Sequence, residues 1–209
     1  MQLKCLIIDF GNVLGFFDHG LACRRLADLG GGRKSSNEVH GAVFESGLEE
    51  QYDRGDIPTP QFLARLRQLS AAQDASDDDL AAAWSDIFRR NEAVIRMLPG
   101  LNDALGLRLV LGSNTNELHQ RQFAKQFADA LRHFDHQVLS FRVRHRKPDP
   151  GFYRCCLEAA GCEPAHCVFI DDRADYVKAA RRTGMRGIAY DAATVDLPAA
   201  LRALGVHCS

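Results

Sequence analysis

The chain has 209 residues, of which 46% are hydrophobic and 25% charged, a composition typical of a globular protein with one domain and an insertion, or with two small domains. The net charge of −1 argues against nucleic acid or a membrane surface as a partner, and no apolar run approaches the ~18 residues of a membrane span. Seven cysteines, scattered from Cys5 to Cys208, and the lack of a signal-peptide core indicate reduced thiols in the cytoplasm.

The first predicted element is a strand over residues 3–9, which is apolar on both faces like a central strand of a parallel sheet. Residues 15–91 contain no convincing strand. They offer helix starts instead, such as Ser35 followed three positions later by Glu38, the spacing of a capping box. A turn between two expected helices has Gly55 at its left-handed position. We therefore expect an inserted all-helical domain over residues 15–91.

After residue 92, predicted strands and helices alternate along the chain. This alternation, with short connections, predicts an α/β fold, a Rossmann-like parallel sheet with helices on both faces, formed by residues 1–14 and 92–209. The strands are expected at Leu107–Leu111, Gln137–Phe141, Cys167–Ile170 and Gly187–Tyr190, and the helices at Glu117–Leu131, Gly151–Ala160, Ala174–Thr183 and from about Leu197.

Polar residues follow the ends of several predicted strands, where parallel sheets bind their ligands. Asp9 ends the first strand, and Ser113 and Asn114 follow the second. The Ser113–Asn114 pair fits either the N-cap of the next helix or a phosphate site, because both uses need a hydroxyl and free N–H groups at a helix N-terminus.

A basic loop and an acidic pair complete the set of candidates. Lys147 ends the basic run 142–147 and fits either a solvated loop or an ammonium that neutralises a phosphoryl group and a carboxylate. Asp171 and Asp172 are adjacent carboxylates after a buried run. Two adjacent carboxylates repel each other unless a cation is present, and their oxygen atoms are suitable ligands for Mg²⁺.

In this order, these four motifs resemble those of the haloacid dehalogenase superfamily, and the resemblance covers essentially the whole chain. It implies that Asp9 is the nucleophile that forms an aspartyl-phosphate. Ser113, helped by Asn114, resembles the phosphoryl-binding group, and Lys147 resembles the cation that orients both partners. The insertion over residues 15–91 resembles the small helical cap that closes over the substrate in this family, and its turn around Gly55 resembles the part that contributes to substrate choice.

The resemblance also implies a metal site that holds the cofactor Mg²⁺. Asp172 resembles a direct ligand beside Asp9 and the carbonyl of Gly11, while Asp171 would act through water. Asp175 is a candidate for a supporting role behind these ligands.

The function implied is a Mg²⁺-dependent phosphatase that acts on a small phosphorylated metabolite, such as a sugar phosphate, without nucleic acid or membrane as a partner. A homo-oligomer is compatible with the sequence but not indicated by it. A rival from the same superfamily is hydrolytic dehalogenation of a 2-haloacid, which needs no metal. Because the acidic pair Asp171-Asp172 is a liability beside a carboxylate substrate, the sequence favours the phosphatase.

Gly11 occupies the position at which typical phosphatases of the family have an acid that protonates the leaving oxygen. Losing such a group typically costs ~10²–10⁴ in rate. The loss is tolerable for a leaving group that needs little protonation, as in a sugar 1-phosphate or acyl phosphate. This is our first choice, because the Asp-x-Gly-Asn-Val form resembles that of the α-D-glucose-1-phosphate phosphatase subgroup.

Two alternatives to a substrate of this kind stay open. Another group could replace the acid, and Asp18, His19 and His119 are candidates, although each also fits a helix cap or a surface histidine. Alternatively, the protein binds a phosphorylated metabolite without turnover. The intact Asp9 argues against that, since a pure binding module has no use for a nucleophile.

Overall fold

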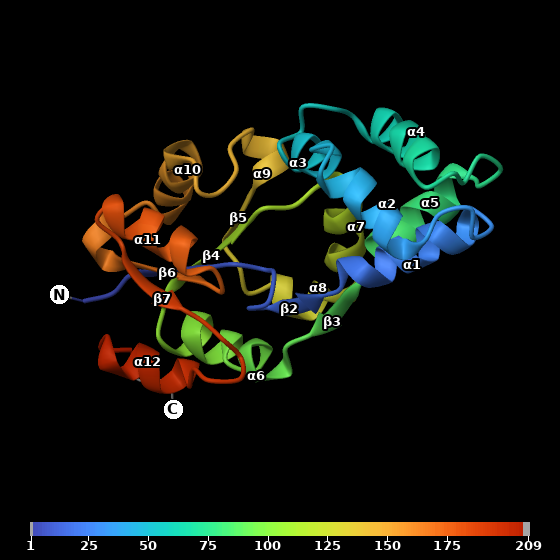
Figure 1. Ribbon diagram of the computed structural model, residues 1–209. Helices are drawn as coiled ribbons and strands as arrows, with labels where there is room; N and C mark the ends of the chain where they lie inside the picture. Colours follow the sequence, from blue (N-terminus) through green and yellow to red (C-terminus); the bar gives the residue numbers. More distant parts are fainter. Residues whose placement is uncertain (1, 207–209) are drawn as a thin grey trace.

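The computed structural model describes residues 2–206, so Cys208 lies outside the described residues. Its centre is a parallel sheet of five strands in the order β5-β4-β1-β6-β7, which confirms the predicted fold class (Figure 1). In the middle of the sheet, Ile8 is in register with Leu111 on one side and Ile170 on the other. The strands are β1 (Cys5–Ile8), β4 (Arg108–Ser113), β5 (His136–Leu139), β6 (Cys167–Asp171) and β7 (Arg186–Ala189).

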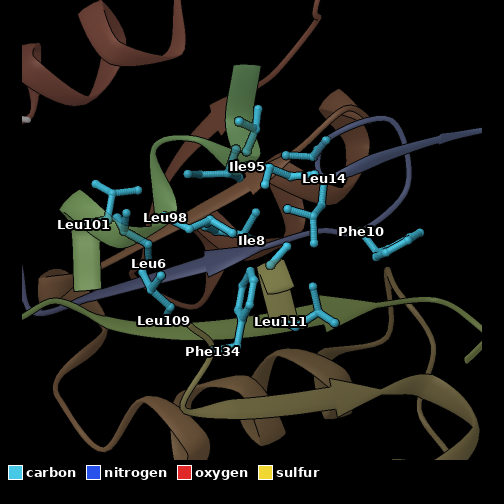
Figure 2. Close-up of a cluster of buried hydrophobic side chains, with 14 of the residues drawn as sticks. Leu6, Ile8, Phe10, Leu14, Ile95, Leu98, Leu101, Leu109, Leu111 and Phe134 are labelled. Atoms are coloured by element: carbon cyan, nitrogen blue, oxygen red, sulfur yellow. The ribbon is translucent and has the colours of Figure 1, made fainter. Parts of the chain in front are cut away.

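Successive residues of β1 point to opposite faces of the sheet, and each face has its own apolar core. Leu6 and Ile8 belong to the cluster shown in Figure 2, whereas Cys5 and Ile7 belong to the cluster on the other face. The first face is covered by α6 (Glu92–Ile95) and α12 (Leu197–Ala203), and the second by α10 (Pro150–Ala160) and α11 (Ala174–Arg182).

A group of helices, inserted between β1 and the rest of the sheet, packs around a third apolar cluster. The expected capping box of Ser35 and Glu38 is present, and Gly55 has the expected left-handed conformation, with φ 72°. Leu118, from the α/β part of the chain, also joins this cluster. The helices are α1 (His19–Leu29), α2 (Ser36–Phe44), α3 (Leu48–Asp53), α4 (Thr59–Leu69) and α5 (Asp77–Ser85).

The expectation of no strand in residues 15–91 is wrong. Two strands of three residues each, β2 (Gly15–Phe17) and β3 (Phe88–Arg90), pair antiparallel where the chain enters and leaves the helical insertion (Figure 1). Each strand is too short for a local pattern, and their pairing joins segments far apart in the sequence. The insertion boundaries at residues 14/15 and 91/92 remain a prediction.

The predicted helix Glu117–Leu131 is divided in two at Phe127, whose ring is buried in the core. None of the helices within residues 2–206 is long and apolar enough to cross a bilayer. The remaining helical segments are α7 (Glu117–Gln126), α8 (Ala128–Leu131), α9 (Ser140–Val143), a π-helical turn at Gly100–Ala104 and a 3₁₀ turn at Pro164–His166.

Candidate active site

Asp9 follows β1 directly, and its side chain is buried. Its Oδ1 atom accepts hydrogen bonds from the backbone N–H of Phe10 (2.8 Å) and from Nζ of Lys147 (2.9 Å). No residue within the described range 2–206 donates to Oδ2. Burial raises the pKa of Asp9 to about 7, although Lys147 lowers it. A bound cation would lower this pKa further and favour the charged, nucleophilic form.

Lys147 lies between three acceptors in the interior. Its Nζ also donates to Asp171 Oδ2 (2.6 Å) and to the carbonyl of Gly112 (3.1 Å). Burial acts to lower the pKa of Lys147, but the carboxylates of Asp171 and Asp9 outweigh burial and hold the pKa above its usual value. The loop conformation of Lys147 is fixed by Asn114, whose amide group accepts from the Lys147 N–H (2.8 Å) and donates to its carbonyl (3.1 Å).

Ser113 and Asn114, which follow one another at the end of β4, have different contacts. Ser113 is buried and lines the same cavity as Asp9, and its phosphoryl-binding role remains a prediction. The amide of Asn114 is engaged with the backbone of Lys147, which differs from the expected contact with a ligand. Neither residue caps the next helix, because the N-cap of α7 is Asn116.

Asp171 and Asp172 also have different partners. Both oxygens of Asp171 are engaged, one with Lys147 and the other with the N–H of Arg173 (3.0 Å). Asp172 is half-buried and accepts a hydrogen bond from the Asn12 amide (2.9 Å). Burial raises the pKa of Asp172, although the Asn12 amide lowers it. Asp175 is exposed and pairs with Arg173 instead of facing the site.

The donor set suits a hard divalent cation. Oxygen atoms of Asp9, Asp171 and Asp172 lie within 4.8 Å of one another, and carboxylate oxygens are the ligands that Mg²⁺ prefers. Because both oxygens of Asp171 are already engaged, whereas Oδ2 of Asp9 is not, the carboxylates of Asp9 and Asp172 are the better placed to hold the ion. The residues fit the expected metal.

A cavity of about 330 Å³ opens beside these groups. On the sheet side it is lined by Asp9, Gly11, Ser113, Lys147 and Asp172. The helical insertion contributes titratable groups and aromatic rings to the same cavity, namely His19, Phe44, Glu49 and Asp53, with Phe17 and Phe88 from the short β2–β3 ladder. The insertion thus covers the site, as a cap would.

None of the three candidates for a replacement acid has the properties of one. Asp18 is exposed and caps α1, and the N–H of Leu21 lowers its pKa. Burial lowers the pKa of His19. His119, expected at the surface, is buried, and burial lowers its pKa to about 3.

Both ring nitrogens of His119 are occupied. Its Nδ1 faces the side-chain amide nitrogen of Asn116 (3.1 Å), whose oxygen already accepts from the His119 N–H. Nδ1 is therefore the acceptor. Nε2 carries the proton and donates it to the carbonyl of Trp84 (3.2 Å). A neutral ring with both nitrogens engaged cannot protonate a leaving group, so His119 supports the structure.

Three further residues of the site are not apparent from the sequence. Asn12 has a positive φ of 53°, which Asn tolerates better than most residues, and its place directly after Gly11 is the one available signal. Glu49 lines the cavity but lies outside the turn around Gly55 that is expected to contribute to substrate choice. Arg146 also lines the cavity, and its only signal is its place in the basic run 142–147.

Comparison with known proteins identifies the family. The family model of the haloacid dehalogenase-like hydrolases matches residues 4–184. The chain therefore belongs to this family and is a hydrolase, which confirms the resemblance to the haloacid dehalogenase superfamily. D-ribitol-5-phosphate phosphatase of Bacteroides thetaiotaomicron is 23% identical over 192 residues, which cover 88% of this chain and 89% of the relative. A phosphatase of Mycobacterium tuberculosis is 28% identical over 201 residues, covering 91% and 88%.

Solved structures share the fold. A haloacid dehalogenase family enzyme from Bacteroides thetaiotaomicron, in complex with magnesium and inorganic phosphate, has a TM-score of 0.82 at 24% identity and covers 96% of this chain and 100% of its own. L-2-haloacid dehalogenase from Xanthobacter autotrophicus has a TM-score of 0.63 at 19% identity, covering 98% and 83%. At these identities the likeness concerns the fold alone.

Proposed function

We propose that the protein is a Mg²⁺-dependent phosphatase that transfers the phosphoryl group of a small metabolite to Asp9 and then to water. One observation carries the proposal: Lys147 and a backbone N–H hold Asp9 through Oδ1, while Oδ2 accepts from no described residue and Asp9 lines the cavity. A charged oxygen oriented in this way is suited to attack phosphorus. A haloacid substrate would bring its own carboxylate next to the three of the site, so dehalogenation is disfavoured.

The other residues of the site would bind the phosphoryl group and the ion. Asp9, Asp172 and the carbonyl of Gly11 would hold Mg²⁺, with Asp171 behind them. When bound, the ion supplies positive charge to the phosphoryl oxygens. The hydroxyl of Ser113 would donate to one of those oxygens, while Lys147 keeps Asp9 oriented and offsets part of the negative charge of the site.

The substrate we propose is a phosphorylated sugar or polyol. The cavity volume of about 330 Å³ is at the small end for ligand sites, and two relatives are named as phosphatases of D-ribitol 5-phosphate and of phosphorylated carbohydrates. If Gly11 leaves the site without a catalytic acid, we expect the substrate to be a sugar 1-phosphate or an acyl phosphate, whose leaving groups need little protonation. With an acid elsewhere in the cavity, esters with poorer leaving groups become possible substrates.

The test is phosphate release from D-glucose 1-phosphate, D-ribitol 5-phosphate and acetyl phosphate, with Mg²⁺ and with EDTA. We expect turnover that requires Mg²⁺ and that Asp9→Asn reduces by at least about 10³-fold, because the nucleophile is lost. Asp28→Asn is the matched control, since Asp28 is an exposed carboxylate of α1. Ligand binding without release of phosphate by the unmodified protein would indicate a binding module instead.

A further inference from the structure

Two acidic side chains of α3 face the same cavity as Asp9. Glu49 and Asp53 are four residues apart, so they lie on one side of the helix, and both line the cavity. The side chain of Glu49 is 15% exposed and that of Asp53 only 4%. Two neighbouring carboxyl groups in such a buried place cannot both be charged without a large cost in free energy.

The nearest cation, Arg146, offsets the negative charge of these two carboxyl groups only in part. Arg146 lies 3.5 Å from an oxygen of Glu49 and 3.6 Å from one of Asp53. Its Nε, which faces Asp53, has no hydrogen-bond partner among the described residues. These separations are too long for good hydrogen bonds. The exposed carboxyl group of Glu50 also lies 3.8 Å from this guanidinium. Arg146 therefore faces three carboxyl groups and binds none of them closely.

The partners of the pair decide which carboxyl group keeps a proton. Burial raises the pKa of Asp53 as well, but Arg146 and a hydrogen bond from the Asn116 amide (2.9 Å) lower it and favour its charged form. No donor of this kind lowers the pKa of Glu49. Burial and, after it, the charge of Asp53 raise the pKa of Glu49 to about 8, although Arg146 lowers it. Of the two carboxyl groups, Glu49 is the one whose surroundings favour the protonated form at neutral pH.

Residues of the neighbouring helices do not reverse this result. His19 on α1 faces Glu49 and would lower its pKa if charged, but burial lowers the pKa of His19 itself. On α2, His40 acts on His19 and lowers its pKa further. On α3, Glu50 has a side chain that is 49% exposed; it pairs with Arg54 and lies 3.8 Å from Arg146.

On the basis of the proposed phosphatase function, we propose that Glu49 is the catalytic acid that Gly11 cannot be. As Asp9 Oδ2 bonds to phosphorus, the bond from phosphorus to the leaving oxygen breaks, and Glu49 donates its proton to that oxygen. Water then attacks the aspartyl-phosphate and gives a proton to the Glu49 carboxylate. The phosphorus–Oδ2 bond breaks, which restores Asp9 and releases phosphate. The cap would thus supply the acid when it covers the substrate.

The inference is tested with two phosphate esters that differ in their need for an acid. D-Ribitol 5-phosphate has a poor alkoxide leaving group, whereas 4-nitrophenyl phosphate has a stable phenolate. In a single turnover, before the aspartyl-phosphate is hydrolysed, we expect Glu49→Gln to slow leaving-group release from ribitol 5-phosphate by about 10²-fold or more, and from the nitrophenyl ester by less than about 5-fold. The fall in this release rate for ribitol 5-phosphate above pH 8 is expected to be absent from the variant.

Glu50→Gln is the matched control and is expected to leave both rates unchanged. The inference is wrong if Glu49→Gln slows leaving-group release from both esters equally, which indicates a role in binding or folding, or if it slows release from neither. Turnover of the nitrophenyl ester alone by the unmodified protein also overturns it, because no acid would then be at work.

A second measurement separates this inference from the proposed function. At neutral pH, infrared spectroscopy of the protein is expected to show a carboxylic-acid carbonyl band that Glu49→Gln removes and Glu50→Gln retains. If the unmodified protein hydrolyses neither ester, the proposed function fails, and the band shows whether Glu49 is still a protonated acid. Absence of the band from the unmodified protein overturns the assignment of Glu49.

Discussion

At the scale of single residues, the site depends on side chains that hold other side chains. Asn12 occupies a left-handed turn after Gly11 and donates its amide to Asp172. That hydrogen bond favours the charged form of Asp172 and fixes the direction of its oxygens, both of which metal binding requires. Asn12 is therefore expected to determine how tightly the ion is bound.

Substitution of Asn12 can separate its backbone role from its side-chain role. Glycine adopts a φ of 53° without strain, so Asn12→Gly removes only the amide. We expect the Mg²⁺ concentration for half-maximal activity to rise about 10-fold with little change in the free energy of unfolding. Asn12→Ala should show the same loss of affinity and an added loss of stability. An unchanged Mg²⁺ requirement in both variants would contradict the role given to Asn12.

Motif residues could be predicted from the sequence because strand ends are local features. Asp9, Ser113 and Asp172 each follow a short buried run, and all three line one cavity. The partners of Asn114 and Glu49 could not be predicted in the same way. Asn114 bonds to a loop 33 residues away, and the environment of Glu49 depends on the docking of the helical insertion onto the sheet.

At the scale of elements, the docking of the helical insertion onto the sheet domain requires a close approach between α3 and α9. Gly55 follows α3 with a φ of 72°, and a Cβ atom there would lie 2.4 Å from the carbonyl oxygen of Phe141. Ser140, at the start of α9, also donates to the carbonyl of Asp53 (2.6 Å). A glycine is thus needed at position 55 both for the left-handed turn and for the close approach to α9. The sequence pattern indicates only the first of these.

The cost of the close approach can be measured with two glycine variants. Gly32 has a similar φ of 69°, and a Cβ atom there would have no neighbour within 4 Å beyond the adjoining residues of the described chain. Gly32→Ala should therefore lower the free energy of unfolding only by the cost of a left-handed conformation, about 1–2 kcal/mol. Gly55→Ala should lower it by a further ~1–3 kcal/mol, because its Cβ atom overpacks against α9. Urea unfolding of both variants gives the comparison, and equal losses would show that α3 is free to move away from α9.

At the scale of the whole molecule, the buried His119 and the half-buried Glu49 line the cavity between insertion and sheet, and their shifted pKa values affect stability in opposite directions. The pKa of His119 is about 3, below its ordinary 6.5. Between these values the unfolded chain binds a proton that the folded chain does not, so stability falls as pH falls. The pKa of Glu49 is about 8, above its ordinary 4.5, so stability falls as pH rises through that window.

The two effects oppose each other between pH 4.5 and 6.5 and act separately outside that range. From pH 6.5 to 8, Glu49→Gln should remove a loss of stability of up to about 1.4 kcal/mol per pH unit. From pH 4.5 toward 3, His119→Gln should remove the loss that accompanies falling pH. Urea unfolding across this pH range measures both slopes, with the exposed Glu50→Gln and His136→Gln as controls. If these controls change the slopes as much as the buried variants do, burial between insertion and sheet is not the cause.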